Sequence, residues 1–143
     1  MKKSAALVLT LTAISTVSFG LTLHSMDKAQ VDKAFVNNTA TSIPTANLNG
    51  RRIQNSVTVF LNKKGQIFGK MEPKPMNAPQ TDHGTYVIKH DGTMMVTWKH
   101  WDHAKPIHAH FFDTKNAYVA IDNAMVFHTA FMKAEIHSGN HLK

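Results

Sequence analysis

Residues 56–71, with the sequence SVTVFLNKKGQIFGKM, decide the fold class. Branched and aromatic residues alternate with polar ones as far as Leu61, a turn-forming stretch follows, and the alternation resumes up to Met71. A period of two is typical of a half-buried β-strand, and two such strands around a short glycine-containing loop form a hairpin. This stretch therefore predicts a β-hairpin within an antiparallel sheet.

The same pattern continues toward the C-terminus. Residues 84–89 and 93–98 flank Asp91-Gly92, a dipeptide that favours hairpin turns, and three prolines within residues 72–80 predict a loop. Further strands are expected at residues 107–112, 118–121 and 125–136, although the last segment also fits a helix. About seven short strands separated by turns predict a mainly β fold, a small antiparallel meander that is barrel- or sandwich-like.

Ahead of the strands, residues 25–38 predict one short N-terminal helix, with Asp27 in the capping position. Four apolar residues fall near one face of this helix: Met26, Val31, Ala34 and Phe35. Residues 39–50 are polar and contain Pro44 and Gly50, so this segment is expected to be a connector or an extended strand edge.

The chain begins with the pattern of an export signal. Lys2 and Lys3 form a short positive region, residues 5–19 carry no charge, and the small residues Ser18 and Gly20 stand at the end of this stretch. This pattern predicts cleavage after Gly20, or else after Ser25, and a periplasmic or secreted protein. The alternative is an uncleaved anchor in the inner membrane. The expected organisation is a signal peptide at 1–20, a helix and connector at 21–50, and a β-domain at 51–143.

Composition excludes several classes of function. The chain has no cysteine, which excludes a lipoprotein anchor, a disulfide framework, thiolate zinc sites and cysteine-based catalysis. The formal net charge is +7, and removing the two lysines of residues 1–20 leaves +5, scattered rather than gathered into a basic stripe. We therefore expect a soluble, weakly cationic surface and no binding of nucleic acid.

Several short motifs between residues 57 and 140 suggest a relative. The strand–turn–strand hairpin is followed by Asp82-x-Gly84-x-Tyr86, by Asp91-Gly92-x-x-Met95-x-x-Trp98, and by a closing Gly139-Asn140. This arrangement resembles a group of short exported proteobacterial proteins catalogued as domain of unknown function 995. The resemblance implies a small, exported all-β module without an established activity.

The sequence departs from that family at two positions. Family members tend to carry a cysteine where Met95 stands and its partner where His108 stands. Loss of both together is expected if one cross-strand disulfide was replaced as a pair. The resemblance then implies that Met95 and His108 face each other across neighbouring strands.

Histidine is the unusual element of the composition, because ten occur in the chain and six of them fall between His83 and His110. On a strand, His108 and His110 point to the same face, while Ile107, Ala109 and Phe111 point to the other. Pro106 can bend the chain so that His100 or His103 approaches this pair. Imidazole suits Zn and Cu, and the nearby methionines would favour copper, so the candidate metal ligands are His100, His103, His108 and His110. A His-x-His pair is also common on solvent-facing strands, and no established zinc signature is present.

Histidine also gives the surface a dependence on pH. Histidine titrates near neutrality, so the protein should become more cationic between pH 7 and pH 5. We therefore expect stronger association with anionic envelope surfaces at acidic pH.

Catalytic signatures are missing from the sequence. It has no Gly-x-Ser-x-Gly elbow, no paired glutamates in one region and no glycine-rich phosphate loop. Trp98 is expected in the core, and Trp101 either at a rim, where it could stack on a ligand, or buried against the neighbouring loop. The favoured function is a noncatalytic exported domain with a binding or structural role. The alternatives are a Zn- or Cu-binding protein and an enzyme that uses a histidine base.

Overall fold

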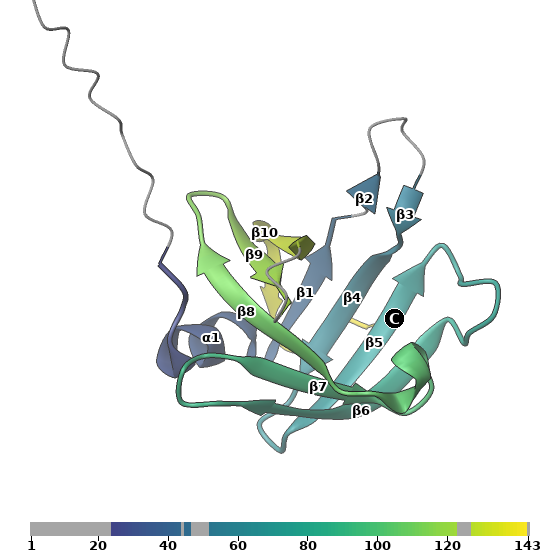
Figure 1. The fold of residues 1–143 in the computed structure, drawn as a ribbon, viewed down its shortest axis with the longest axis horizontal. Coiled ribbons are helices and arrows are strands. Elements are labelled where there is room, and N and C mark those ends of the chain that lie inside the picture. Colours follow the sequence, from purple (N-terminus) through teal and green to yellow (C-terminus); the bar gives the residue numbers. More distant parts are fainter. Residues whose placement is uncertain (1–23, 44, 47–51, 123–126, 143) are drawn as a thin grey trace, which may run out of the picture.

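A computed structural model describes residues 24–43, 45–46, 52–122 and 127–142. Eight antiparallel strands close into a barrel in the order β1-β10-β9-β8-β7-β6-β5-β4, and two further strands form a small separate sheet (Figure 1). The barrel strands are β1 (Asn38–Ser42), β4 (Ser56–Leu61), β5 (Gln66–Glu72), β6 (Thr81–Ile88), β7 (Met94–Trp98), β8 (Ile107–Asp113), β9 (Ala117–Ile121) and β10 (Phe127–Ser138). The small sheet pairs β2 (Thr45–Ala46) with β3 (Arg52–Gln54). The predicted mainly β fold with one short helix is confirmed, in its barrel form.

The hairpin that decided the fold class forms between β4 and β5. Phe60 pairs with Phe68 and Leu61 with Ile67, which places the turn at residues 62–65 as predicted. Asn62 shapes this turn, because its side-chain oxygen accepts hydrogen bonds from the backbone N–H groups of Lys64 (2.9 Å) and Gln66 (3.0 Å).

The Asp91-Gly92 turn joins β6 to β7 as expected. Gly92 has a φ of +84°, and a Cβ at this position would lie 1.9 Å from the carbonyl oxygen of Met26. Only glycine fits there, because the turn needs a positive φ and the N-terminal segment passes directly over it. Strand β6 begins at Thr81, three residues before the predicted start, and therefore includes Asp82.

The helix α1 (Lys28–Phe35) closes one end of the barrel (Figure 1). Asp27 caps it as predicted, accepting a hydrogen bond from the backbone of Gln30, whose side chain bonds back to the backbone of Asp27. Val31, Ala34 and Phe35 are buried, so the apolar face of α1 lies over the barrel interior. The helix is shorter than the predicted 25–38 because the chain leaves it at Val36 and turns at Asn37, whose φ is 62°.

Strand β1 decides between the connector and the extended strand edge expected at residues 39–50 only as far as Ser42, because residues 44 and 47–50 lie outside the described residues. It pairs with β10 on one side and with β4 on the other, so it closes the barrel and is not an edge. Strand β1 and the barrel strands that follow residue 50 therefore belong to the same barrel. Strand β10 resolves the alternatives left open for residues 125–136 in favour of a strand, with residues 125–126 outside the described part of the chain.

The expected signal peptide at residues 1–20 also lies outside the described residues. Among the residues that are described, no helix has both the length and the apolar character needed to cross a membrane.

Candidate functional site

The barrel encloses a cavity of about 390 Å³ between α1 and the opposite end of the barrel. It reaches solvent at that opposite end, where the exposed Asp102 and the half-buried Asn55 line it. Most of the lining is apolar and comes from the inward positions of the strands: Val57, Val59, Leu61, Ile67, Met71, Met94, Val96, Ile107, Ala109 and Ala120, together with five aromatic residues. The cavity is thus a largely apolar chamber with a polar mouth.

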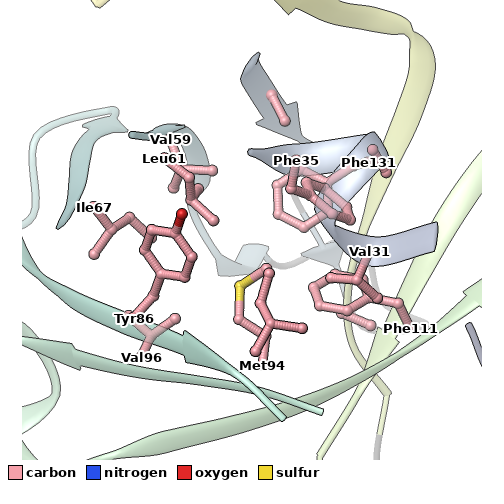
Figure 2. Packing of buried hydrophobic residues seen from close by; sticks show 14 of the residues in the cluster. Val31, Phe35, Val59, Leu61, Ile67, Tyr86, Met94, Val96, Phe111 and Phe131 are labelled. Atoms are coloured by element: carbon pink, nitrogen blue, oxygen red, sulfur yellow. The ribbon is translucent and has the colours of Figure 1, made fainter. Parts of the chain in front are cut away.

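Three phenylalanines form the floor of this cavity beside α1. The ring of Phe35 lies 4.6 Å from that of Phe111 and 5.3 Å from that of Phe131, measured between centroids, in tilted and edge-on arrangements. Figure 2 shows these three rings together, with Met94 on the neighbouring part of the wall. Such ring pairs add specific attraction to the burial of their apolar surface, so this end of the barrel is firmly filled.

Two tryptophans form the wall nearest the mouth. Trp98 lies at the end of β7 and Trp101 begins the short 3-10 helix η1 (Trp101–Ala104), and their ring centroids are 4.6 Å apart. A Cβ on Gly69 of β5 would lie 2.6 Å from Trp101 and 2.7 Å from Trp98, so only glycine leaves room for both indoles. Of the two alternatives for Trp101, burial is correct: 2% of its surface is exposed.

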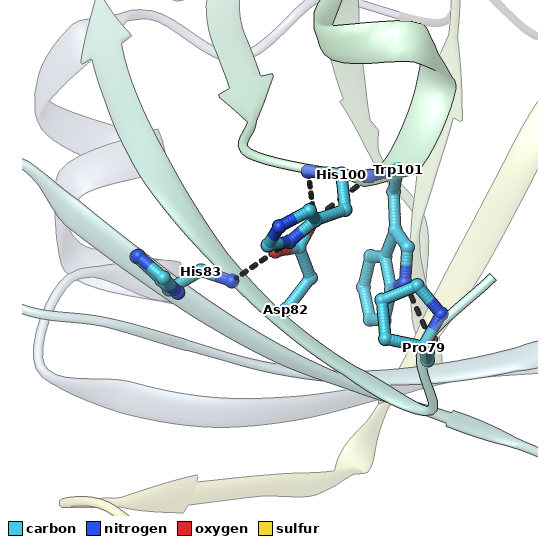
Figure 3. A network of polar contacts seen from close by, with 5 residues as sticks. All are labelled: Pro79, Asp82, His83, His100 and Trp101. Carbon is cyan, nitrogen blue, oxygen red and sulfur yellow. Dashed lines mark hydrogen bonds and ion pairs between the residues drawn. The ribbon is translucent and has the colours of Figure 1, made fainter.

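Asp82 holds η1 against the barrel (Figure 3). Its Oδ2 accepts hydrogen bonds from the backbone N–H groups of His100 and Trp101, both at 2.8 Å. Its Oδ1 accepts one from the backbone of His83 at 2.9 Å and lies 3.0 Å from His100 Nδ1. The indole Nε1 of Trp101 donates a further bond to the carbonyl oxygen of Pro79, at 2.8 Å. The mouth-side wall of the cavity is therefore fixed by a polar network.

This network also sets the charge state of Asp82, whose side chain is fully buried. Burial by itself raises the pKa of the carboxyl, but the hydrogen bonds from Trp101, His100 and His83 together outweigh it and hold the pKa below its ordinary value of 3.8. Three of the four contacts come from backbone N–H groups. Asp82 therefore acts as an ionised brace for the loop.

The predicted metal ligands do not converge. Ile107, Ala109 and Phe111 line the cavity, which confirms that His108 and His110 point to the outer face of β8. His110 Nδ1 lies 3.1 Å from Thr93 Oγ1. His108 pairs directly with Met95 across β7 and β8, the juxtaposition that the family resemblance implied.

The other two candidates lie in the loop between β7 and β8. The Nδ1 atom of His100 contacts the carboxylate of Asp82, and His103 is exposed within η1. In the described part of the chain, no group of three or more His, Asp or Glu side chains is placed to hold a metal ion. Binding of Zn or Cu therefore stays a hypothesis that this geometry does not support.

Sequence reasoning missed the cavity and the brace. The signal that could have found the brace is the buried position of Asp82 in the alternation of β6, where an apolar residue would be expected. The sequence does not predict the backbone conformation of η1, because Asp102, His103 and Ala104 all adopt a positive φ of 52–57° although none of them is glycine. Comparisons with protein-family models, curated proteins and solved structures found no match, so the function has to be argued from the cavity itself.

Proposed function

We propose that this domain is an exported, noncatalytic binding protein that holds one small, largely apolar molecule inside its barrel. The observation that carries the proposal is the cavity of about 390 Å³ lined mainly by apolar side chains. An eight-stranded barrel is just wide enough either to be filled by its own side chains or to hold one small ligand. Here the inward positions on β8 and β9 include Ala109 and Ala120, which leave the interior open.

The size of the ligand follows from the volume of the cavity. An apolar cavity of about 150 Å³ binds benzene, so a volume of about 390 Å³ accommodates a molecule of roughly fifteen non-hydrogen atoms. At about 0.4 kcal/mol per such atom, the binding free energy is about −6 kcal/mol, which corresponds to a Kd of tens of micromolar.

The location of the protein is part of the same proposal. The uncharged stretch behind Lys2 and Lys3 favours export, to the periplasm or beyond the cell. A cysteine-free barrel is compatible with an oxidising compartment, because it has no thiol that could be oxidised there.

Intrinsic fluorescence offers a direct test. The chain contains two tryptophans, and both line the cavity. Titration with the neutral apolar dye N-phenyl-1-naphthylamine should therefore give saturable energy transfer from tryptophan to the dye, with one dye bound per chain.

Two neighbouring positions on β8 give a matched pair of variants. Ala109→Phe fills the cavity and should weaken dye binding at least tenfold, whereas His108→Phe adds the same ring on the outer face and should leave the Kd unchanged. Unsaturable binding by the natural chain, or equal Kd values for the two variants, would contradict the proposal.

A further inference from the structure

A buried hydroxyl in the cavity lining has no partner. Thr129 of β10 is 5% exposed and lines the cavity, yet its Oγ1 makes no hydrogen bond to any described residue. A buried polar atom that stays unpaired costs about 1–3 kcal/mol, so such atoms are uncommon in folded proteins. A ligand atom that accepts its hydrogen would remove this cost.

A second hydroxyl lies close to Thr129. Ser42 of β1 pairs with Phe131, two residues from Thr129 along β10, so Ser42 and Thr129 are diagonal neighbours in the cavity lining. The Ser42 hydroxyl oxygen accepts a hydrogen bond from the backbone N–H of Val57 at 2.9 Å. Because that bond uses a lone pair, the hydroxyl hydrogen of Ser42 can still be donated. The two side chains form a hydroxyl corner in an otherwise apolar wall.

The charge of the lining restricts the ligand further. Asp102 at the mouth is the one charged residue among the described residues that line the cavity, and no lysine, arginine or histidine is among them. Burying a carboxylate or phosphate without a cation would be costly, and Asp102 would add repulsion. The lining therefore disfavours fatty acids and other anions.

We propose that the ligand is an uncharged apolar molecule with one carbonyl oxygen, and that this oxygen accepts a hydrogen bond from Thr129 in the hydroxyl corner. This inference rests on the proposed function, and it adds the chemical class of the ligand. A ketone or an ester fits both the donors of the corner and the lack of a cation. Rotation about the Cβ–Oγ1 bond of Thr129 is sufficient to turn its hydroxyl hydrogen toward an acceptor.

Three molecules of nearly the same shape separate the alternatives: 2-acetylnaphthalene, 2-isopropenylnaphthalene and 2-naphthoate. They present a carbonyl, a methylene and a carboxylate at the same place on one apolar body. In equilibrium dialysis at pH 7, the natural chain should bind the ketone at least tenfold more tightly than the carboxylate. Thr129→Val, which keeps the shape and removes the hydroxyl, should weaken ketone binding about three- to tenfold and leave hydrocarbon binding unchanged.

Two controls accompany this comparison. Thr85→Val makes the same change at an exposed position of β6 and should alter neither affinity. Thr129→Ser retains a hydroxyl and should keep the preference for the ketone, which separates loss of the donor from disturbance of the fold.

The possible failures are distinguishable. If Thr129→Val weakens ketone and hydrocarbon equally, or if the carboxylate binds most tightly, the inference about the carbonyl is wrong while the apolar cavity still binds. If the natural chain binds none of the three molecules, the proposed function itself fails.

Discussion

Replacing Asp82 by asparagine tests whether a buried carboxylate holds the cavity wall together. Asparagine has nearly the same shape but one acceptor oxygen in place of two, and it carries no charge. In its best orientation, that oxygen keeps the two bonds from the backbone of His100 and Trp101. The side-chain NH2 group then faces His100 Nδ1, which can accept a hydrogen bond from it when the imidazole proton is on Nε2. The same NH2 group also faces the backbone N–H of His83, which loses its hydrogen-bond acceptor.

The magnitude follows from this inventory. The unpaired N–H of His83 costs about 1–3 kcal/mol, and hydrogen bonds to a neutral oxygen are about half as strong as those to a carboxylate. We therefore expect Asp82→Asn to lower the free energy of unfolding by about 2–4 kcal/mol at pH 7. Urea unfolding followed by tryptophan fluorescence measures this difference. It should also show a changed native emission, because Trp101 is attached to the brace.

The pH dependence has a definite sign. Because the pKa of Asp82 is lower in the folded protein than its ordinary 3.8, the unfolded chain takes up this proton first as the pH falls. The stabilisation by Asp82 is complete well above pH 3.8 and is lost as the pH falls through the pKa of the folded state. The gap in unfolding free energy between the natural chain and Asp82→Asn should thus shrink as the pH falls below about 4.

Asp32→Asn is the matched control. Asp32 pairs with Lys28 at 2.7 Å on the exposed side of α1, and such surface pairs contribute about 0–1 kcal/mol. The reasoning is refuted if Asp82→Asn lies within about 0.5 kcal/mol of the natural chain at pH 7, or destabilises it no more than Asp32→Asn does.

Two further substitutions test the walls and the floor of the cavity. Gly69→Ala places a methyl group against Trp101 and Trp98, so it should destabilise the fold by about 1–3 kcal/mol. It should also alter the near-ultraviolet circular dichroism of the two indoles, and an unchanged spectrum would contradict this packing. Phe35→Ala removes a fully buried ring from the floor and should lower the free energy of unfolding by about 3–5 kcal/mol in urea titrations, and a loss below 1 kcal/mol would show that the helix does not pack as described.

The sequence predicts the elements of this fold that depend on local signals. The hairpin at 56–71 and the Asp91-Gly92 turn follow from alternation and turn chemistry, which need only neighbouring residues. Strand β1 has the sequence NTATS, without a large apolar residue, so its propensity gives little indication of a strand. It becomes one because β4 and β10 each present an edge with unpaired backbone groups, and β1 satisfies both.

The candidate site depends on contacts between distant parts of the chain, and for that reason the sequence does not reveal it. Asp82 and Trp101 meet because β6 and β7 are paired antiparallel with Gly84 opposite Trp98, which places Asp82 beside the residues that follow Trp98. Alternation alone predicts the correct face of β8 for His108 and His110, but the approach of His100 depends on a loop path that no local pattern specifies. His100 instead finds its partner in Asp82.

The energetics of the barrel interior favour an occupant. In large-to-small core substitutions, an empty enclosed cavity costs about 24 cal/mol per Å³, so a volume of about 390 Å³ that opens to solvent costs at most about 9 kcal/mol. This upper figure is comparable to the entire stability of a typical domain, about 5–15 kcal/mol. Larger side chains at Ala109 and Ala120 would fill the space, and the chain has alanine at both positions. If the proposed ligand binds, its presence at a hundred times its Kd should stabilise the folded barrel by about 2.7 kcal/mol.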